Sequence, residues 1–134
     1  MAPEETRVAI DHDVDIVAAR RKARELATRL GFSGSDLTFI ATAISEVARN
    51  IVVYAHRGEI VLSAAQRGTR RGVLVIARDQ GPGIPDIPRA MRDGFSTGKS
   101  LGLGLPGAKR LMDEFEIASE VGKGTTITMR KWTR

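Results

Sequence analysis

Two polar side chains share one face of a stretch with strong helical periodicity. Glu46 and Asn50 lie four residues apart, with Thr42 one turn earlier, beside a regular apolar stripe. The neutral carbonyl oxygen of an asparagine suits Mg²⁺, which takes few protein ligands together with water and substrate phosphates. A glutamate one turn away could accept the proton of an attacking hydroxyl or water. The alternative is an ordinary pair at the helix border, hydrogen-bonded to a neighbouring loop.

A second group of residues follows an apolar run at positions 73–77 that is typical of a buried strand. Asp79 comes directly after this run, and Gly81 and Gly83 follow at alternate positions. A carboxylate at a strand end can accept a hydrogen bond from an exocyclic amine, and the glycines let a planar ring approach the backbone closely. Taken alone, the same pattern is also compatible with a simple turn.

Glycines recur in two further places. Residues 102–107 read G-L-G-L-P-G at the end of a long segment rich in Gly and Pro, and residues 122–125 read G-K-G-T before a final strand pattern. An irregular segment of that length in a compact domain is normally functional. Taken alone, G-K-G-T is compatible with an ordinary hairpin turn.

Two familiar phosphate-binding motifs do not account for these glycines. Residues 94–100 place three residues between their glycines where a P-loop needs four. The G-x-G-x-x-G pattern at 102–107 does not follow a buried strand, as a dinucleotide-binding fingerprint requires. Neither motif is therefore retained.

The patterns E-x-x-x-N, D-x-G-x-G, G-L-G-L and G-x-G-T occur in this order along the chain. In this order they resemble the motifs of the Bergerat-fold ATP-binding family, also called GHKL. The family includes the ATPase domains of gyrase and MutL, the catalytic domains of histidine kinases and small bacterial serine kinases. Residues 43–51, 79–87, 93–97 and 104–115 are similar to the RsbT-type switch kinases of the stressosome. The resemblance covers nearly the whole chain, so we expect no added helix with a phospho-accepting histidine.

The resemblance implies a role for each matching residue. It implies that Glu46 is the general base, that Asn50 is the Mg²⁺ ligand and that Asp79 reads the adenine amine. Lys99 is assigned to the γ-phosphate by its charge, because no fixed motif places it. The other members of the predicted ATP site shape the base pocket or meet the phosphates: Gly81, Gly83, Ile84, Gly102, Leu103, Gly104 and Thr125.

The resemblance also implies an activity and partners. It implies a cytoplasmic, ATP- and Mg²⁺-dependent serine/threonine kinase that phosphorylates STAS-domain proteins of the stressosome scaffold and, once released, activates a PPM-type phosphatase. A nucleotide-dependent switch that binds partners without phosphorylating them, of the anti-sigma or ATPase type, is the first alternative. A basic nucleic-acid binder is the second. A gyrase-like ATPase is disfavoured, because we expect no transducer domain for lid closure to drive.

Composition limits the remaining classes. The 134 residues, 42% hydrophobic and 28% charged, predict one compact domain over 1–134 and exclude a disordered chain. The absence of Cys, with only two His, excludes thiol chemistry and multi-His metal sites. A net charge of +5 is compatible with a phosphate-rich ligand and equally with an ordinary solvated surface. The 4% of aromatic residues provide little stacking surface for nucleic acid. No stretch approaches the roughly 20 apolar residues of a membrane-spanning helix. We therefore expect a cytoplasmic protein with neither membrane nor nucleic-acid partners.

The elements that must position these residues follow from periodicity and turn signals. We expect strands at 5–11, 59–65, 73–77, 116–121 and 125–132, with a basic turn at 66–72. We expect helices at 16–30, capped by Asp13 or Asp15, then from a Ser35 or Asp36 cap to about Tyr54, and from Pro106 to near Phe115. Because the strands come in adjacent pairs, we predict an α+β fold: a two-layer sandwich whose mixed, mostly antiparallel sheet carries helices on one face.

Overall fold

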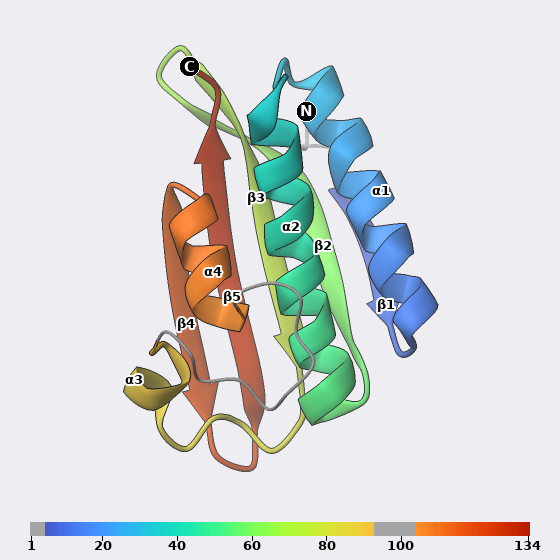
Figure 1. Ribbon diagram of the computed structural model, residues 1–134, viewed down its shortest axis with the longest axis vertical. Helices are drawn as coiled ribbons and strands as arrows, with labels where there is room; N and C mark the ends of the chain where they lie inside the picture. Colours follow the sequence, from blue (N-terminus) through green and yellow to red (C-terminus); the bar gives the residue numbers. More distant parts are fainter. Residues whose placement is uncertain (1–4, 93–103) are drawn as a thin grey trace.

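The computed structural model describes residues 5–92 and 104–134, which form two layers (Figure 1). One layer is a sheet with strand order β1-β2-β3-β5-β4, and the helices α1, α2 and α4 lie together on one of its faces (Figure 1). The strands are β1 (Glu5–Ile10), β2 (Gly58–Arg67), β3 (Arg70–Asp79), β4 (Glu114–Glu120) and β5 (Gly124–Trp132). The helices are α1 (Asp13–Arg29), α2 (Ser35–Asn50), the π-helix η1 (Ile51–Ala55), α3 (Ile87–Ala90) and α4 (Gly104–Leu111).

The α+β sandwich is confirmed, and the sheet is simpler than predicted. Every pairing among the described strands is antiparallel, so the expectation of a mixed sheet is wrong. The chain crosses from β3 to the edge strand β4, which runs parallel to β3, and β5 then returns between them. Because β5 lies between them, β3 and β4 do not pair directly, and no parallel pairing arises among the described strands.

Helix α1 begins three residues earlier than predicted. The prediction that Asp13 or Asp15 is the cap residue is wrong, because His12 takes the cap position. Asp15 lies three residues later, and its carboxylate holds the first turn by accepting the backbone N–H groups of Asp11 and His12, both at 2.9 Å. Its inner side is apolar because Ile16, Ala23 and other residues at helical spacing are buried. Satisfied end groups and a single apolar face together account for the helix.

Helix α2 is the central core helix. Its residues Ile40, Ile44 and Val47 are fully buried, as the apolar stripe predicted. The prediction of a Ser35 or Asp36 cap is wrong, because Gly34 takes the cap position with a φ of 59° and no side chain caps the helix. Ser35 itself already belongs to the first turn, so its backbone cannot serve as the extended cap residue.

The helical path of α2 continues into η1, close to the predicted end at Tyr54. Ile51 remains buried, and the path ends at His56, whose φ is 72°. Contrary to the expectation from composition, the 21 residues Ser35–Ala55 are long and apolar enough to cross a bilayer. Half of the most apolar window is buried within the protein, as in the core helix of a soluble domain.

The hairpin of β2 and β3 is longer than predicted and sets the register at the functional end of the sheet. Pairing runs from Gly58 opposite Asp79 to Arg67 opposite Arg70, so the expected seven-residue turn shrinks to two residues. Exposed arginines extend the ladder because their long side chains reach water from either strand. At the other end, Gly58 pairs with both Ile10 and Asp79, and Asp79 pairs with Thr125. Asp79 and Thr125 are therefore direct cross-strand neighbours.

The segment after the sheet's third strand differs from prediction in its boundaries. Helix α3 was not predicted; the Asp86 carboxylate caps it by accepting the Arg89 N–H at 3.0 Å. Helix α4 ends four residues before the expected Phe115, and β4 begins at Glu114. The chain leaves α4 early because Lys131 donates to the Leu111 carbonyl oxygen at 2.8 Å and Asp113 accepts the Trp132 N–H at 2.8 Å. These bonds fasten the end of α4 to β5.

Candidate functional site

The Asp79 carboxylate uses one of its oxygens to fix the following loop. Its Oδ1 accepts the backbone N–H of Gly81 at 2.9 Å, which closes a tight turn directly after β3. Its Oδ2 has no hydrogen-bond partner among the described residues, and the side chain is half-buried. One acceptor oxygen is therefore open to a ligand donor, as the adenine-reading role requires.

The glycines beside Asp79 allow close backbone approach. A Cβ on Gly83 would collide with the Glu120 carbonyl oxygen, and a Cβ on Gly124 would collide with the Asp79 carbonyl oxygen. Both glycines also have positive φ, 79° and 105°. The Gly122 N–H donates to the Pro82 carbonyl oxygen at 2.8 Å. The loop after β3 and the turn between β4 and β5 thus form one packed unit.

Ser119, on β4, joins the same two segments, and sequence reasoning missed it. Its hydroxyl accepts the Ile84 N–H at 2.7 Å and lies 2.8 Å from the Thr125 hydroxyl. It also lies 3.1 Å from the Gly124 carbonyl oxygen. A lone serine on an exposed edge strand carries no pattern; only knowledge that Ser119 pairs with Thr125 across the strands would have identified it.

Glu46 connects α2 to the beginning of α4. The side chain is buried, and its Oε2 accepts the backbone N–H of Gly104 at 2.9 Å. Its Oε1 pairs with the Arg49 guanidinium at 2.9 Å. This is the contact to a neighbouring segment that the structural alternative predicted, and it also places a carboxylate at the positive end of α4. Arg49 was not predicted, although its spacing of three residues from Glu46 was a usable signal.

Asn50 is the last residue of α2, one turn beyond Glu46. Its side chain is half-buried and makes no hydrogen bond to any residue in the described ranges. No group of three or more His, Asp or Glu side chains that could hold a metal is found among the described residues. An amide oxygen with ligand phosphates is a donor set that fits Mg²⁺.

The structure brings most of the predicted site residues to one end of the sheet. Asp79, Gly81, Gly83, Ile84 and Thr125 surround the end of β3, and Gly81 packs against Ala55 at the end of the α2–η1 path. Glu46, Asn50 and Gly104 come from the helical layer above. Lys99, Gly102 and Leu103 lie outside the described residues. The Asp79 Oδ2 and the Asn50 amide, neither of which bonds to a described residue, fit a purine nucleotide with its metal.

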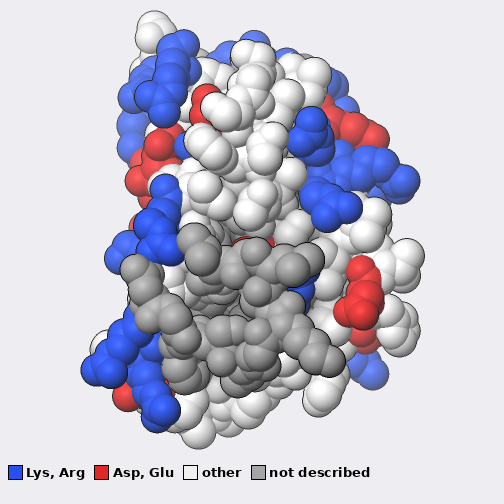
Figure 2. All heavy atoms as spheres, viewed as in Figure 1, with Lys and Arg blue, Asp and Glu red and all other residues white. Residues whose placement is uncertain are grey.

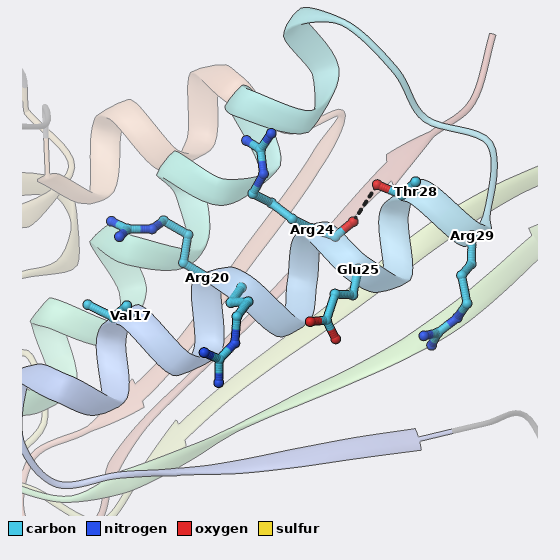
Figure 3. Close-up of a pocket in the computed structure, with 7 residues that line it drawn as sticks. Val17, Arg20, Arg24, Glu25, Thr28 and Arg29 are labelled. Atoms are coloured by element: carbon cyan, nitrogen blue, oxygen red, sulfur yellow. Dashed lines mark hydrogen bonds between the residues drawn. The ribbon is translucent and has the colours of Figure 1, made fainter.

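A hollow with charged side chains along its walls lies elsewhere on the surface, away from the predicted site residues. This hollow, along the outer side of α1, is lined by Arg20, Arg24, Glu25 and neighbouring residues of the same helix (Figure 3). Lys and Arg side chains gather on both flanks of the face shown in Figure 2. The hollow on α1 includes none of the predicted site residues.

Sequence comparisons show the family to which the chain belongs. Residues 11–131 match the family model described as the histidine kinase-like ATPase domain. The chain is 53% identical over 132 residues to the serine/threonine-protein kinase RsbT of Bacillus subtilis, covering 98% of both chains. It is 32% identical to the anti-sigma F factor of Thermoanaerobacter sp., over 85% of this chain and 82% of that protein.

Solved structures show the same fold. The RsbU and RsbW domains of a Mycobacterium tuberculosis protein align with a TM-score of 0.63 and 25% identity. This alignment covers 100% of the present chain but only 33% of that one. The mycobacterial sensor histidine kinase MprB aligns with a TM-score of 0.55 and 17% identity over 99% of each chain.

Proposed function

The chain belongs to the histidine kinase-like ATPase domain family and is a serine/threonine protein kinase; we propose that it phosphorylates STAS-domain proteins of a stressosome scaffold. We propose further that the released kinase activates a PPM-type phosphatase and that it works in the cytoplasm. The observation that carries the proposal is the 53% identity to a serine/threonine-protein kinase over 98% of both chains. The family model spans residues 11–131 and so includes every predicted site residue.

Nucleotide binding would begin at the open end of the sheet. Asp79 accepts the adenine amine through the oxygen that Gly81 does not use, and Gly81, Gly83 and Ile84 frame the base. The phosphates meet the backbone amides of Gly102, Leu103 and Gly104 at the positive end of α4, with Lys99 as the γ-phosphate partner. Thr125 lies beside Asp79 and adds its hydroxyl to the base pocket.

Phosphoryl transfer would use Glu46 and Asn50. Mg²⁺, held by the Asn50 carbonyl oxygen and the phosphates, would neutralise charge on the transferring phosphoryl group. Glu46 accepts the proton of the serine or threonine hydroxyl that attacks. Because its two oxygens are engaged by Gly104 and Arg49, one of these bonds must open for that step. Opening the Gly104 bond would free an amide for phosphate at the same time.

A second candidate function is a nucleotide-dependent, non-catalytic interaction switch of the anti-sigma type. It is favoured by the similarity to anti-sigma F factors, at 32% identity. In that case nucleotide would control partner binding without phosphoryl transfer to a protein.

One labelling experiment distinguishes these functions. The protein is incubated with γ-labelled ATP, Mg²⁺ and a STAS-domain stressosome protein, and the label is located by mass spectrometry. Label on a serine or threonine of the STAS protein supports the kinase. Phosphate release without protein label supports an ATPase, and binding without either supports the switch. Asn50→Ala serves as a companion variant, in which weaker Mg·ATP binding and slower transfer are expected together.

A further inference from the structure

The two segments that would enclose the nucleotide base are joined by one hydroxyl group. Ser119 contacts Ile84 in the loop after β3, and it also contacts Gly124 and Thr125 at the start of β5. Among the described residues it is the only side chain that forms hydrogen bonds to both segments, and it lies outside every motif of the sequence. The position of Ser119 therefore bears directly on the geometry of the pocket.

The donor and acceptor in each hydrogen bond of Ser119 follow from the number of hydrogen bonds that a serine hydroxyl can donate and accept. A serine hydroxyl donates one hydrogen and accepts two. The Ile84 N–H must be a donor and the Gly124 carbonyl oxygen must be an acceptor. All three contacts are satisfied only if Ser119 donates to Gly124, at 3.1 Å, and accepts the Thr125 hydroxyl hydrogen, at 2.8 Å. Thr125 then has only lone pairs left for a ligand.

This assignment makes the pocket doubly accepting. Thr125 and Asp79 are paired directly across β5 and β3, which places their side chains side by side on one face. The Asp79 Oδ2 and the lone pairs of Thr125 can therefore both accept a hydrogen bond from a ligand donor. The exocyclic amine of adenine supplies donors at this edge, whereas guanine presents a carbonyl oxygen there.

We propose that Ser119 is a positioning residue that sets base selectivity: its hydroxyl fixes Thr125 as an acceptor beside Asp79 and ties the loop ending at Ile84 to β4. The inference rests on the proposed ATP binding. Without the Ser119 hydroxyl, Thr125 can rotate its hydrogen toward a ligand acceptor, and the Ile84 N–H loses its partner. Both changes weaken the preference for adenine over guanine without touching the phosphate site.

The experiment measures binding of three ligands, each with Mg²⁺, by titration calorimetry: ATP, GTP and inorganic triphosphate. For Ser119→Ala we expect a roughly 5- to 20-fold loss of ATP affinity, as for one lost hydrogen-bond group. We expect a smaller ATP-to-GTP ratio and unchanged triphosphate affinity. Ser119→Thr, which keeps the hydroxyl, should retain the wild-type ratio. The matched control Ser63→Ala removes a buried serine hydroxyl on β2, five positions from the Gly58–Asp79 pair, and should change nothing.

The outcomes separate this inference from the proposed function. A wild-type protein that binds ATP without preferring it over GTP overturns the selectivity role of Ser119 and leaves ATP binding intact. A folded Ser119→Ala protein with an unchanged ratio, or with equally weakened triphosphate binding, overturns it too. A wild-type protein that binds no nucleotide overturns both. If Ser119→Ala fails to fold, Thr125→Val decides: it removes the second acceptor and must reduce the ATP-to-GTP ratio.

Discussion

At the scale of single residues, the two oxygens of Asp79 have separate tasks. One accepts the Gly81 N–H, and the other is open. In Asp79→Asn the amide oxygen keeps the bond to Gly81, so the amide NH₂ faces the adenine amine, donor against donor. We expect ATP affinity to fall by about 1–3 kcal/mol, measured by titration calorimetry.

The control for this substitution is another loop carboxylate with a similar backbone bond. Asp86 caps α3 through the Arg89 N–H, so Asp86→Asn makes the same chemical change at a carboxylate that is not among the predicted site residues. Unchanged ATP affinity in a folded Asp79→Asn protein would refute the adenine-reading role.

Glu46 differs from Asp79 in that both of its oxygens already have partners in the protein. Glu46→Gln keeps an oxygen for the Gly104 N–H and removes basicity, so we expect ATP binding to survive. Phosphoryl transfer should fall by about 10²–10⁴-fold, with the low end favoured because a loose transition state needs little base assistance. Rapid-quench assays with the proposed STAS-domain substrate measure the rate.

Arg49 provides the matched comparison for Glu46. Arg49→Gln also breaks the ion pair but leaves the carboxylate, so it separates loss of the pair from loss of the base. If Glu46→Gln phosphorylated at the wild-type rate, Glu46 would have only its structural role between α2 and α4.

The residues that the sequence could identify are those whose role needs a fixed local pattern. Asp79 with Gly81 and Gly83 falls in this class, because one short loop contains the whole arrangement. The functional role of Asp79 stays a prediction. Ser119 does not, since its contacts to Ile84 and Thr125 depend on which strands pair and in which register. Lys99 remains a prediction from charge alone.

At the scale of elements, the order and type of the five strands and of α1, α2 and α4 were predictable, whereas α3, the π-helical form of η1 and most boundaries were not. The apolar stripe of α2 and the alternation in β5 follow from burial on one face, which periodicity records. The length of the β2–β3 hairpin depends on backbone pairing of exposed arginines, which no hydrophobic pattern marks. The end of α4 depends on a tertiary bond from Lys131, twenty residues later in the chain.

Lys131 gives a test of how α4 is held. Its ammonium group is buried and donates to the last carbonyl of α4, Leu111, at 2.8 Å, and it lies 5.6 Å from the centre of the Phe39 ring. Lys131→Met keeps the apolar stem but leaves that carbonyl without its donor. We expect the free energy of unfolding in urea to fall by about 1.5–3 kcal/mol.

The matched control is Lys123→Met, which removes an exposed lysine from the β4–β5 turn. A change within about 0.5 kcal/mol is expected there. Equal stability of Lys131→Met and wild type would show that the buried ammonium does not hold α4.

At the scale of the whole molecule, the fold assembles one site from segments that are far apart in the chain. Residues 79–84 and 119–125 meet at one end of the sheet, and Ala55 at the end of η1 packs against Gly81 there. Helix α4 is joined to α2 through the bond between Gly104 and Glu46. The antiparallel order β3-β5-β4 is what brings the last glycine turn beside Asp79.

Acid stability is a property of the whole molecule that two carboxylates should control. Hydrogen bonds from the backbone of His12 and Asp11 lower the pKa of Asp15 below its usual 3.8. Hydrogen bonds from Arg67 and Trp132 lower the pKa of Glu114 below its usual 4.5. Groups with a lowered pKa in the folded state stabilise it above the unfolded value, and this contribution is lost as the pH falls through the folded value.

We therefore expect the melting temperature to fall as the pH drops below about 4.5, the usual Glu value. Asp15→Asn/Glu114→Gln should lower the melting temperature at neutral pH and flatten its decline in acid, because the two lost groups no longer bind protons on unfolding. Calorimetric scans across this range measure both effects. The control Asp11→Asn/Glu25→Gln makes the same charge change at side chains without hydrogen bonds to the described residues, so it should keep the wild-type slope. A double variant with the wild-type acid slope would show that neither carboxylate links the fold to pH.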